Sequence, residues 1–389
     1  MEEAVIVATA RSPIGRANKG SLIDVRADEL VADIVRALVA KVPQLDPTEI
    51  DDLICGNVAQ AGETGFNIAR VAGILAGLPL SVPGHTVQRF CASSLQAINS
   101  AANSIKVGQG HVYIAAGVEK ASVPPDAPNN MAAMIAGVNP KLFGSTEGMP
   151  NIYIPMGMTA ENVVDKYGVK REDMDAFAKL SQDRAVAAQA SGFFEREITP
   201  ITKADGTVVT TDDCPRAGTE VEKLAQLKPS FRPDGSVTAG NSCPLNDGAA
   251  AVMIMSLTKA KQLGLKPLAR IVTTAQSGNE PELMGVAPID AIPRALKLAG
   301  LTIADIDVVE LNEAFAAQVL PVCEVTGIDI ETQLNPHGGA IALGHPFGST
   351  GARIMTTLIN DLETLDKTFG METMCAAGGM AMATIIERI

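Results

Sequence analysis

One pattern occurs twice in the chain, first as Ile34-Val35-Arg36-Ala37-Leu38 followed by Ile50-Asp51-Asp52-Leu53-Ile54, and again as Ile292-Pro293-Arg294-Ala295-Leu296 followed by Ile306-Asp307-Val308-Val309. Each copy reads as a helix, a short turn and a strand. The shared letters are few, and chance similarity is the alternative interpretation. A true repeat predicts two halves of the same topology.

The repeat also relates two segments rich in chemically reactive residues. Cys91 lies 55 residues after Arg36 (91 − 36), and the residue 55 positions after Arg294 is Ser349 (294 + 55), within the Gly-rich run 344–351. If the halves pack about a pseudo-twofold axis, these two segments should meet near its centre.

Short strand-like runs alternate with helical patterns in the first part of the chain: Ala4–Ala8, Ala27–Val42, Asp52–Gly56 and Ile68–Ala76. This alternation is typical of an α/β architecture. The length of 389 residues is enough for two packed domains, or for one domain duplicated.

The amino-acid composition of the sequence changes between the halves. Residues 121–158 are rich in Pro, Asn, Met and Gly, a helix is expected over Thr159–Ser191, and residues 198–241 are again rich in turns. Long irregular segments in compact proteins are usually functional. We therefore interpret residues 121–244 as an inserted loop domain that covers a substrate site. Residues 1–120 with 245–267 would form the first half, to whose sheet Ala249–Met255 returns, and 268–389 the second.

Composition excludes several classes of function. The net charge of −13 repels polyanions, and aromatic residues make up 3% with no Trp, so we expect no binding to nucleic acid. The apolar runs are too short to span a bilayer, and the acidic start Met1-Glu2-Glu3 lacks the features of a targeting peptide, which predicts a cytoplasmic location. The six cysteines stand far apart, so neither a disulfide framework nor a metal site is expected.

The first candidate for chemistry is Cys91. Small or apolar residues follow it with helical spacing, which predicts that Cys91 starts a buried helix. Unpaired backbone N–H groups at a helix start can lower the pKa of a thiol and make it a nucleophile. A cysteine that only fills the core is the alternative.

The second candidate is His345, one of four histidines, in a run that contains five glycines, Gly338-Gly339-Ala340-Ile341-Ala342-Leu343-Gly344-His345-Pro346-Phe347-Gly348-Ser349-Thr350-Gly351. Pro346 disfavours helical geometry at His345, so the histidine should lie in the loop before the next helix. There it could deprotonate Cys91 or donate to a carbonyl oxygen, and a structural histidine in a turn is the alternative.

Two further segments complete a possible acyl-transfer site. Met374-Cys375-Ala376-Ala377-Gly378-Gly379-Met380 is a turn of small residues that would place a second thiol, and N–H groups, beside an oxyanion. In Glu310-Leu311-Asn312-Glu313, a strand ends in a polar cluster where Asn312 could hold a water or a carbonyl oxygen. Each segment alone is weak evidence, but together they fit acyl transfer.

Over its whole length the sequence resembles the thiolase family, through Arg89-Phe90-Cys91-Ala92-Ser93, Asn312-Glu313-Ala314-Phe315, Gly338 to Pro346, and Cys375-Ala376-Ala377-Gly378-Gly379-Met380. The resemblance implies a five-layered αβαβα core with two similar halves and a loop domain that binds coenzyme A. It also implies a dimer or tetramer, coenzyme A and acyl-CoA as substrates, no permanently bound cofactor, and other β-oxidation enzymes as further partners.

Roles carry over from the family by position. Cys91 would become acylated, His345 would activate it, and Cys375 would move the proton at the acyl α-carbon. One oxyanion hole would consist of His345 and a water held by Asn312, and the other of the N–H groups of Cys91 and Ala377. Ping-pong kinetics would follow.

The resemblance is less specific for the residues that contact coenzyme A. Arg216 aligns with a coenzyme-contacting arginine, Lys223 follows it, and Met156, Phe231 and Phe315 are candidates for the wall of the pantetheine tunnel. The chain departs from the family pattern at Ser94, Cys243, Pro336-His337 and Ala377. Cys243 stands where the family has a small serine beside the bound thioester. The resemblance therefore does not fix the shape of the acyl pocket.

The subtype depends on Ile154-Pro155-Met156-Gly157. Biosynthetic thiolases typically carry Tyr-His-Met-Gly there, so we expect the degradative type, which cleaves 3-ketoacyl-CoA. Synthesis of acetoacetyl-CoA is the alternative. Three other classes are disfavoured. A ketoacyl synthase lacks the second cysteine that this chain has, and a non-catalytic carrier would have lost catalytic residues that this chain keeps. A Rossmann dehydrogenase would require G-x-G-x-x-G after the first strand, and none follows it.

Overall fold

The computed structural model describes residues 2–122 and 138–389, and a ten-stranded sheet runs through it in the order β10-β11-β12-β9-β1-β8-β5-β3-β4, with β2 beside β8. The strands are β1 (Ala4–Arg11), β2 (Gly15–Arg16), β3 (Asp52–Gly56), β4 (Gly84–Val87), β5 (Val112–Lys120), β8 (Asn246–Ser256), β9 (Ala269–Gly278), β10 (Val308–Leu311), β11 (Phe369–Ala376) and β12 (Met380–Arg388). A separate hairpin consists of β6 (Ile201–Thr202) and β7 (Val208–Val209).

The order of the strands confirms the predicted duplication. In the first half β3 runs parallel to β5 and β5 antiparallel to β8, and in the second half β10 runs parallel to β11 and β11 antiparallel to β12. The halves join where β1 pairs with β9, through Val5↔Arg270 and Ile6↔Ala269. The repeated pattern corresponds to a helix and a strand in each half, α1 (Ala27–Ala40) with β3 and α9 (Pro288–Ala299) with β10.

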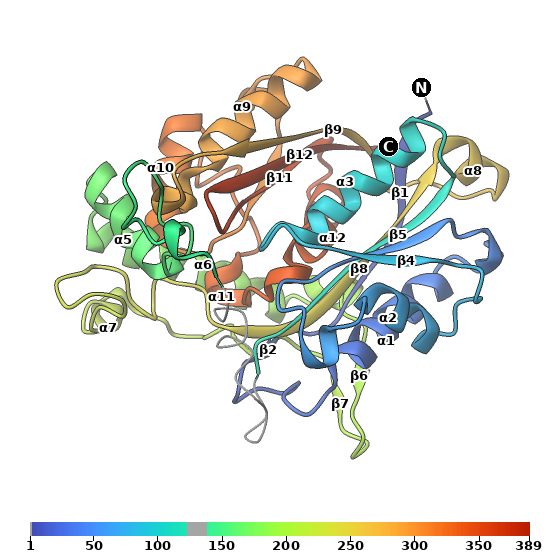
Figure 1. Ribbon diagram of the computed structural model, residues 1–389, viewed down its shortest axis with the longest axis horizontal. Coiled ribbons are helices and arrows are strands. Elements are labelled where there is room, and N and C mark those ends of the chain that lie inside the picture. Colours follow the sequence, from blue (N-terminus) through green and yellow to red (C-terminus); the bar gives the residue numbers. More distant parts are fainter. Residues whose placement is uncertain (1, 123–137) are drawn as a thin grey trace.

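The main helices form three layers around the two halves of the sheet, as Figure 1 shows. They are α1 (Ala27–Ala40), α2 (Ile68–Leu75), α3 (Ser93–Lys106), α9 (Pro288–Ala299), α10 (Ala316–Thr326) and α12 (Thr350–Thr364), with the shorter α8 (Leu257–Gln262) and α11 (Ala340–Leu343). α1 and α2 pack on one outer face, α9 and α10 pack on the other, and α3 and α12 lie between the halves. This is the five-layered αβαβα arrangement expected.

The central layer is held by apolar side chains from both halves. Leu95, Ile98 and Leu358 are fully buried there, and each such side chain contributes about 1.5–3 kcal/mol when it leaves water. This core fixes the starts of α3 and α12 side by side.

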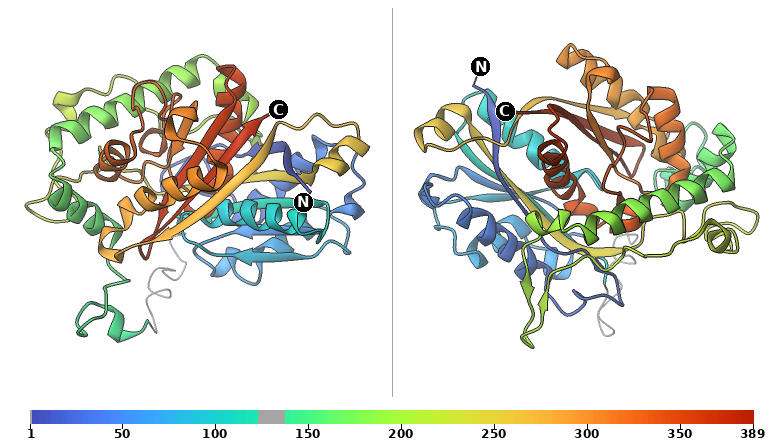
Figure 2. Two further views of the ribbon diagram at one scale, coloured as in Figure 1. Left: turned by 90° about the horizontal axis from the view of Figure 1, so that it is seen from above. Right: turned by 180° about the vertical axis from the view of Figure 1, so that it is seen from behind.

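The chain between β5 and β8 contains α5 (Met156–Tyr167), α6 (Arg171–Ala190) and α7 (Val221–Leu224), and Figure 2 shows α6 lying along the second half. The single helix expected over Thr159–Ser191 is wrong, because Gly168, at φ +65°, ends α5 and a new helix starts at Arg171. β8 returns to the first half as expected, since it pairs with β1 and β5. Residues 123–137 of the predicted insertion lie outside the described residues, and the division into domains stays a prediction.

Within the described part of the chain, no helix combines the length and the apolar character needed to cross a membrane.

Candidate active site

The two reactive segments related by the repeat meet in the structure. The backbone N–H of Ala352, in the first turn of α12, donates to Ser94 Oγ in the first turn of α3 at 2.9 Å. Gly351 packs so closely against Leu95 that a Cβ at Gly351 would overlap Leu95. The predicted meeting of the segments at the centre of the molecule is confirmed.

Cys91 was expected to start a helix, but it lies in a tight turn two residues before α3 begins. The preceding Phe90 has φ +45°, a left-handed conformation that costs a non-glycine residue about 1–2 kcal/mol. Two hydrogen bonds hold the turn: Arg89 N–H donates to Ser93 Oγ at 2.9 Å, and the Ser93 hydroxyl donates to Phe90 O at 2.6 Å. The turn is therefore fixed by its own residues.

The electrostatics of Cys91 differ from the expectation. Burial raises the pKa of the Cys91 thiol to about 12, and the negative charge of Glu119 acts in the same direction. The backbone N–H groups of Cys91 and Ala377 point at the sulfur and lower the pKa, but they do not outweigh burial. The expected low pKa is thus wrong for the resting site. The two N–H groups are the pair predicted to form an oxyanion hole, and the structure brings them together.

His345 is held in one orientation in the loop between α11 and α12. Its backbone N–H donates to Asn246 Oδ1 at 2.9 Å, and Gly344, at φ +105°, lies where a Cβ would meet the Asn246 amide at 2.6 Å. The ring Nδ1 lies 2.7 Å from Thr350 Oγ1, and that hydroxyl donates to Pro346 O at 2.9 Å. The loop position of His345 is therefore as predicted.

These contacts assign the proton on the His345 ring. Because the Thr350 hydroxyl already donates to Pro346 O, it can only accept from His345, so Nδ1 carries the proton. Nε2 is then an acceptor. Burial lowers the pKa of His345 to about 3, which keeps the ring neutral at physiological pH.

Asn312 follows β10 directly, as predicted, and lies beside the histidine. Its Nδ2 is 3.3 Å from His345 Nε2, and its backbone N–H donates to Thr373 O at 3.0 Å. The Asn312 Oδ1 atom is buried and has no hydrogen-bond partner among the described residues. A buried amide oxygen of this kind is suited to accept from a water or ligand.

Cys375 lies near the end of β11, paired with Ala381, whereas a turn position was expected; the turn begins at Ala377. Its Sγ is 3.1 Å from Gln318 Oε1. Burial raises the pKa of Cys375 well above its ordinary value, and the neighbouring thiols of Cys91 and Cys243 add to this. Three thiols thus interact in one site.

Cys243 and the expected tunnel residues form one wall. Cys243 N–H donates to Ala314 O at 3.0 Å, and Ser242 forms an isolated β-bridge with Phe315. The ring of Phe315 packs edge to face with Phe231, with centroids 6.0 Å apart. Met156 starts α5, and its neighbour Gly157 lies where any Cβ would overlap the Phe231 ring.

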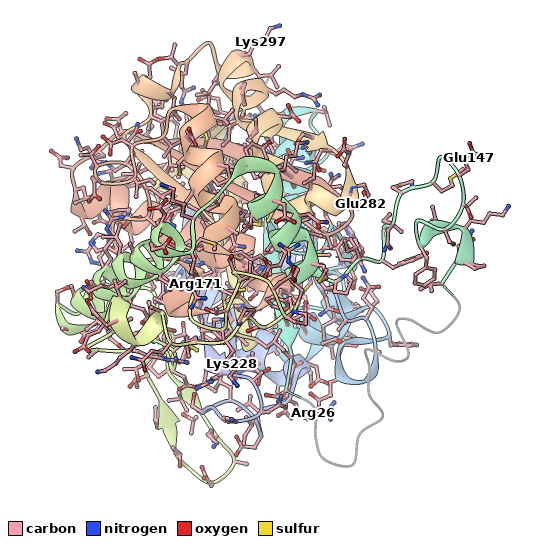
Figure 3. All side chains as sticks on the ribbon, turned by 90° about the vertical axis from the view of Figure 1, so that its left-hand side faces the viewer. Arg26, Glu147, Arg171, Lys228, Glu282 and Lys297 are labelled. Carbon is pink, nitrogen blue, oxygen red and sulfur yellow. The ribbon has the colours of Figure 1, made fainter. Side chains whose placement is uncertain are left out.

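The cations expected to contact coenzyme A lie on the surface of the insertion. Arg216 and Lys223 are both exposed, and Lys223 pairs with Glu220 at 3.0 Å. Arg171 holds this region by donating to Leu224 O and Leu227 O at 2.8 and 3.1 Å, and Figure 3 shows Lys228 on the same face as Arg171. The structure does not bring these cations together with the thiols.

His337 belongs to a different cluster. Its Nδ1 is 2.5 Å from Asp361 Oδ1, and its ring stacks on Phe193 with centroids 3.6 Å apart. Burial lowers the pKa of His337 to about 4. Its contacts support the loop that precedes His345.

Sequence reasoning missed four residues that position the site: Asn246, Gln318, Glu119 and Thr350. Gln318 could have been noticed as a glutamine among the apolar residues of α10. Asn246 and Glu119 carry no local signal, because their partners are distant in the sequence, whereas Thr350 lies only five residues after His345. Among the described residues, no group of His, Cys, Asp and Glu side chains is arranged to hold a metal ion.

Comparisons with known proteins agree with this geometry. Residues 4–258 match the model of the thiolase N-terminal domain, and residues 265–388 match that of the thiolase C-terminal domain. The chain is 45% identical to a beta-ketoadipyl-CoA thiolase of Acinetobacter baylyi and to a 3-ketoacyl-CoA thiolase of Bacillus subtilis, each over the full length of both chains. The crystal structure of an acetyl-CoA acetyltransferase of Bacillus anthracis superposes with a TM-score of 0.91, is 39% identical, and covers 100% of this chain and 99% of its own.

Proposed function

The chain belongs to the thiolase family of acyltransferases, and we propose that it cleaves 3-ketoacyl-CoA with coenzyme A, through an acyl group carried on Cys91. The observation that carries this proposal is the convergence of the thiols of Cys91 and Cys375 with the N–H of Ala377. One thiol can hold the acyl group while the other moves a proton at the adjacent carbon.

In the first half-reaction, Cys91 attacks the 3-keto carbon of the substrate, and its proton passes to Nε2 of His345. The tautomer set by Thr350 leaves Nε2 without a proton, so it can accept the proton of Cys91 in place of the hydrogen bond from Asn312 Nδ2. The bond between C2 and C3 then breaks, its electron pair goes to C2, and the Cys375 thiol gives C2 a proton. Acetyl-CoA leaves, and an acyl-Cys91 thioester and a Cys375 thiolate remain.

In the second half-reaction, the Cys375 thiolate takes the proton of the coenzyme A thiol, whose sulfur attacks the acyl carbon. Cys91 leaves and recovers its proton from His345. The high pKa of the Cys375 thiol fits this role, because Cys375 must start with its proton and must recover it. Ping-pong kinetics follow from the two half-reactions.

Two groups of donors would stabilise the charge that develops on the substrate oxygens. We assign one to the N–H groups of Cys91 and Ala377, which already point at the sulfur of Cys91. We assign the other to protonated Nε2 of His345 and to a water whose hydrogen bond the unpaired Asn312 Oδ1 accepts. One such donor is worth about 10²–10³ in turnover.

Binding of coenzyme A is assigned to the insertion together with Phe315 of the second half. The wall formed by Met156, Phe231 and Phe315 would line the pantetheine arm. The exposed cations Arg216 and Lys223 would meet the phosphates, which a chain of net charge −13 must attract locally.

A homo-oligomer is part of the proposal. β4 is an edge strand of the sheet, and the neighbouring Phe66 and Leu80 are 96% and 75% exposed. An open edge beside large exposed apolar side chains is the kind of surface that a second copy covers.

The substrate proposal depends on Ile154-Pro155, which replaces the Tyr-His of biosynthetic enzymes ahead of Met156. The experiment is thiolysis of a 3-ketoacyl-CoA series from four to sixteen acyl carbons, measured beside condensation of acetyl-CoA. Rates that increase toward longer chains support the degradative type. Activity confined to acetoacetyl-CoA would favour the biosynthetic alternative, and absence of all activity would overturn the proposal.

A further inference from the structure

Gln318 is completely buried in the first turn of α10, between Cys375 and the backbone of Asn312. Its Nε2 donates to Asn312 O at 3.3 Å, and its Oε1 is 3.1 Å from Cys375 Sγ. Gly285 packs directly on it, since a Cβ at Gly285 would lie 2.7 Å from the Gln318 Cβ. The side chain is therefore confined from both ends and from one side.

The orientation of the Gln318 amide follows from its partners. Asn312 O can only accept, so it faces the NH₂ group, and the amide oxygen must face the sulfur. An amide N–H aimed at the sulfur would favour the thiolate and lower the pKa of Cys375. An amide oxygen instead accepts a hydrogen bond from the thiol and has no N–H to offer the thiolate.

We propose that Gln318 is a positioning residue that holds Cys375 as a thiol, with its proton directed at Oε1, between turnovers. This inference rests on the proposed function. Cys375 would enter each cleavage cycle with the proton that C2 of the substrate needs. After that proton leaves, the thiolate faces an amide oxygen, and this repulsion favours uptake of the proton of coenzyme A.

Gln318 also connects Cys375 to the other proton-handling group. The backbone O of Asn312 accepts from Gln318 Nε2, and the side chain of the same Asn312 contacts His345 Nε2 at 3.3 Å. Asn312 thus lies between Gln318 and His345.

The test is exchange of the methyl protons of acetyl-CoA with deuterium from D₂O, which requires Cys375 to move a proton at the α-carbon. One acetyl-CoA acylates Cys91, and a second presents its methyl group to Cys375. Gln318→Met keeps the length of the side chain and removes both hydrogen bonds. We expect exchange to decrease at least about tenfold in Q318M, while Cys91 is still acylated to the extent seen in the wild type, as followed by mass spectrometry.

Gln318→Glu provides the second readout. A protonated Glu can donate to Asn312 O and present its other oxygen to Cys375, as the amide does, whereas the ionised form repels Asn312 O. Exchange in Q318E should therefore be substantial at low pH and should decrease as the introduced carboxyl ionises. The wild-type exchange rate should show no such decrease over the same pH range. If Q318M does not fold, the pH dependence of exchange in Q318E alone tests the role of Gln318.

The matched control is Gln189→Met, which removes a partly buried glutamine on α6 whose Nε2 donates to Asp212 O at 3.4 Å and not to a group beside Cys375. It should exchange at the wild-type rate. Exchange in Q318M within twofold of wild type, or a Q318E profile parallel to that of wild type, would overturn the role of Gln318 alone. A wild-type protein that shows neither acylation nor exchange would overturn the proposed function as well.

Discussion

Ser94 joins the two halves of the protein at the site, because its hydroxyl oxygen accepts the hydrogen bond that the backbone N–H of Ala352 donates at 2.9 Å. That N–H lies in the first turn of α12, where a helix has no acceptor of its own. The bond therefore fixes α12, and the His345 loop before it, against the start of α3.

Removing this acceptor tests the junction. Ser94→Ala leaves a buried N–H unpaired, so we expect the free energy of unfolding to decrease by about 1–3 kcal/mol, with a loss of thiolysis. Ser100→Ala, on the same helix, removes only a bond from the side chain of Gln96 and should change stability much less. Chemical denaturation of both variants measures the difference, and equal losses would argue against the special role of Ser94.

Substitutions of the two thiols should have different effects. Cys91→Ala should abolish acylation, whereas Cys375→Ala should still be acylated and should turn over about 10²–10⁴ times more slowly, since it lacks the acid–base group. Mass spectrometry of protein mixed with 3-ketoacyl-CoA, together with steady-state rates, checks this. Cys323→Ala, a buried cysteine on α10, is the control. Normal activity of C91A would refute the mechanism.

The tautomer of His345 depends on Thr350. Thr350→Val removes the acceptor for Nδ1–H while keeping the shape of the side chain, and we expect the acylation rate to decrease about tenfold or more. Thr356→Val provides the comparison, because Thr356 is buried on the same helix and donates only to Ala352 O at 2.8 Å. Stopped-flow acylation measures both variants. The tautomer assignment predicts a much larger effect at Thr350 than at Thr356.

Glu119 should influence Cys91 through its charge. The carboxylate accepts from the N–H groups of Val58, Ala59 and Gly348 at 3.0, 3.0 and 2.9 Å, and burial raises its pKa to about 7. In Glu119→Gln an acceptor oxygen is lost, so turnover should decrease. At pH 8, where the wild-type carboxyl is mostly ionised, the pKa of Cys91 should decrease and its alkylation by iodoacetamide should accelerate.

Alkylation of Cys375 in the same E119Q sample is the internal control. A general loosening of the site would accelerate the reaction of both thiols, whereas the loss of charge should act mainly on Cys91. Peptide mapping measures the alkylation of Cys91 and of Cys375 separately. Equal acceleration would contradict the electrostatic coupling.

Stability should depend on the buried carboxyl of Glu372. Neither of its oxygens has a hydrogen-bond partner among the described residues, and burial raises its pKa well above the ordinary value, although Arg353 opposes this. Above pH 4.5 the folded state keeps a proton that the unfolded state releases. The stabilising contribution of that proton is therefore full below pH 4.5 and is lost as the pH rises toward the folded pKa.

Glu372→Gln removes this titration. The difference in the free energy of unfolding between E372Q and wild type should grow in favour of the variant from pH 5 to pH 8, by at most about 1.4 kcal/mol per pH unit, and the difference in Tm should grow in the same direction. Glu324→Gln, at an exposed position of α10, should show no such trend. Thermal unfolding at several pH values tests the sign, and a difference that shrinks with pH would be the opposite result.

The sequence by itself determined the duplication and several of the elements, and it supplied the four candidate residues of the site, because each of these is encoded locally. Apolar periodicity marked α1 and β3, Pro346 placed His345 in a loop, and the end of β10 placed Asn312. Gly168 was missed as the end of α5, since a glycine in a helical pattern does not say whether the chain takes a left-handed φ there.

Only the tertiary structure decided how those residues behave. A helix start suggested a low pKa for Cys91, yet the pKa is raised, because burial and Glu119 come from packing that no local pattern reports. The burial of the Asn312 Oδ1 atom and the contact of Cys375 with Gln318 likewise depend on neighbours from other elements. Local spacing encodes periodicity and turns, whereas burial and charge at a site are sums over neighbours that only folding brings together.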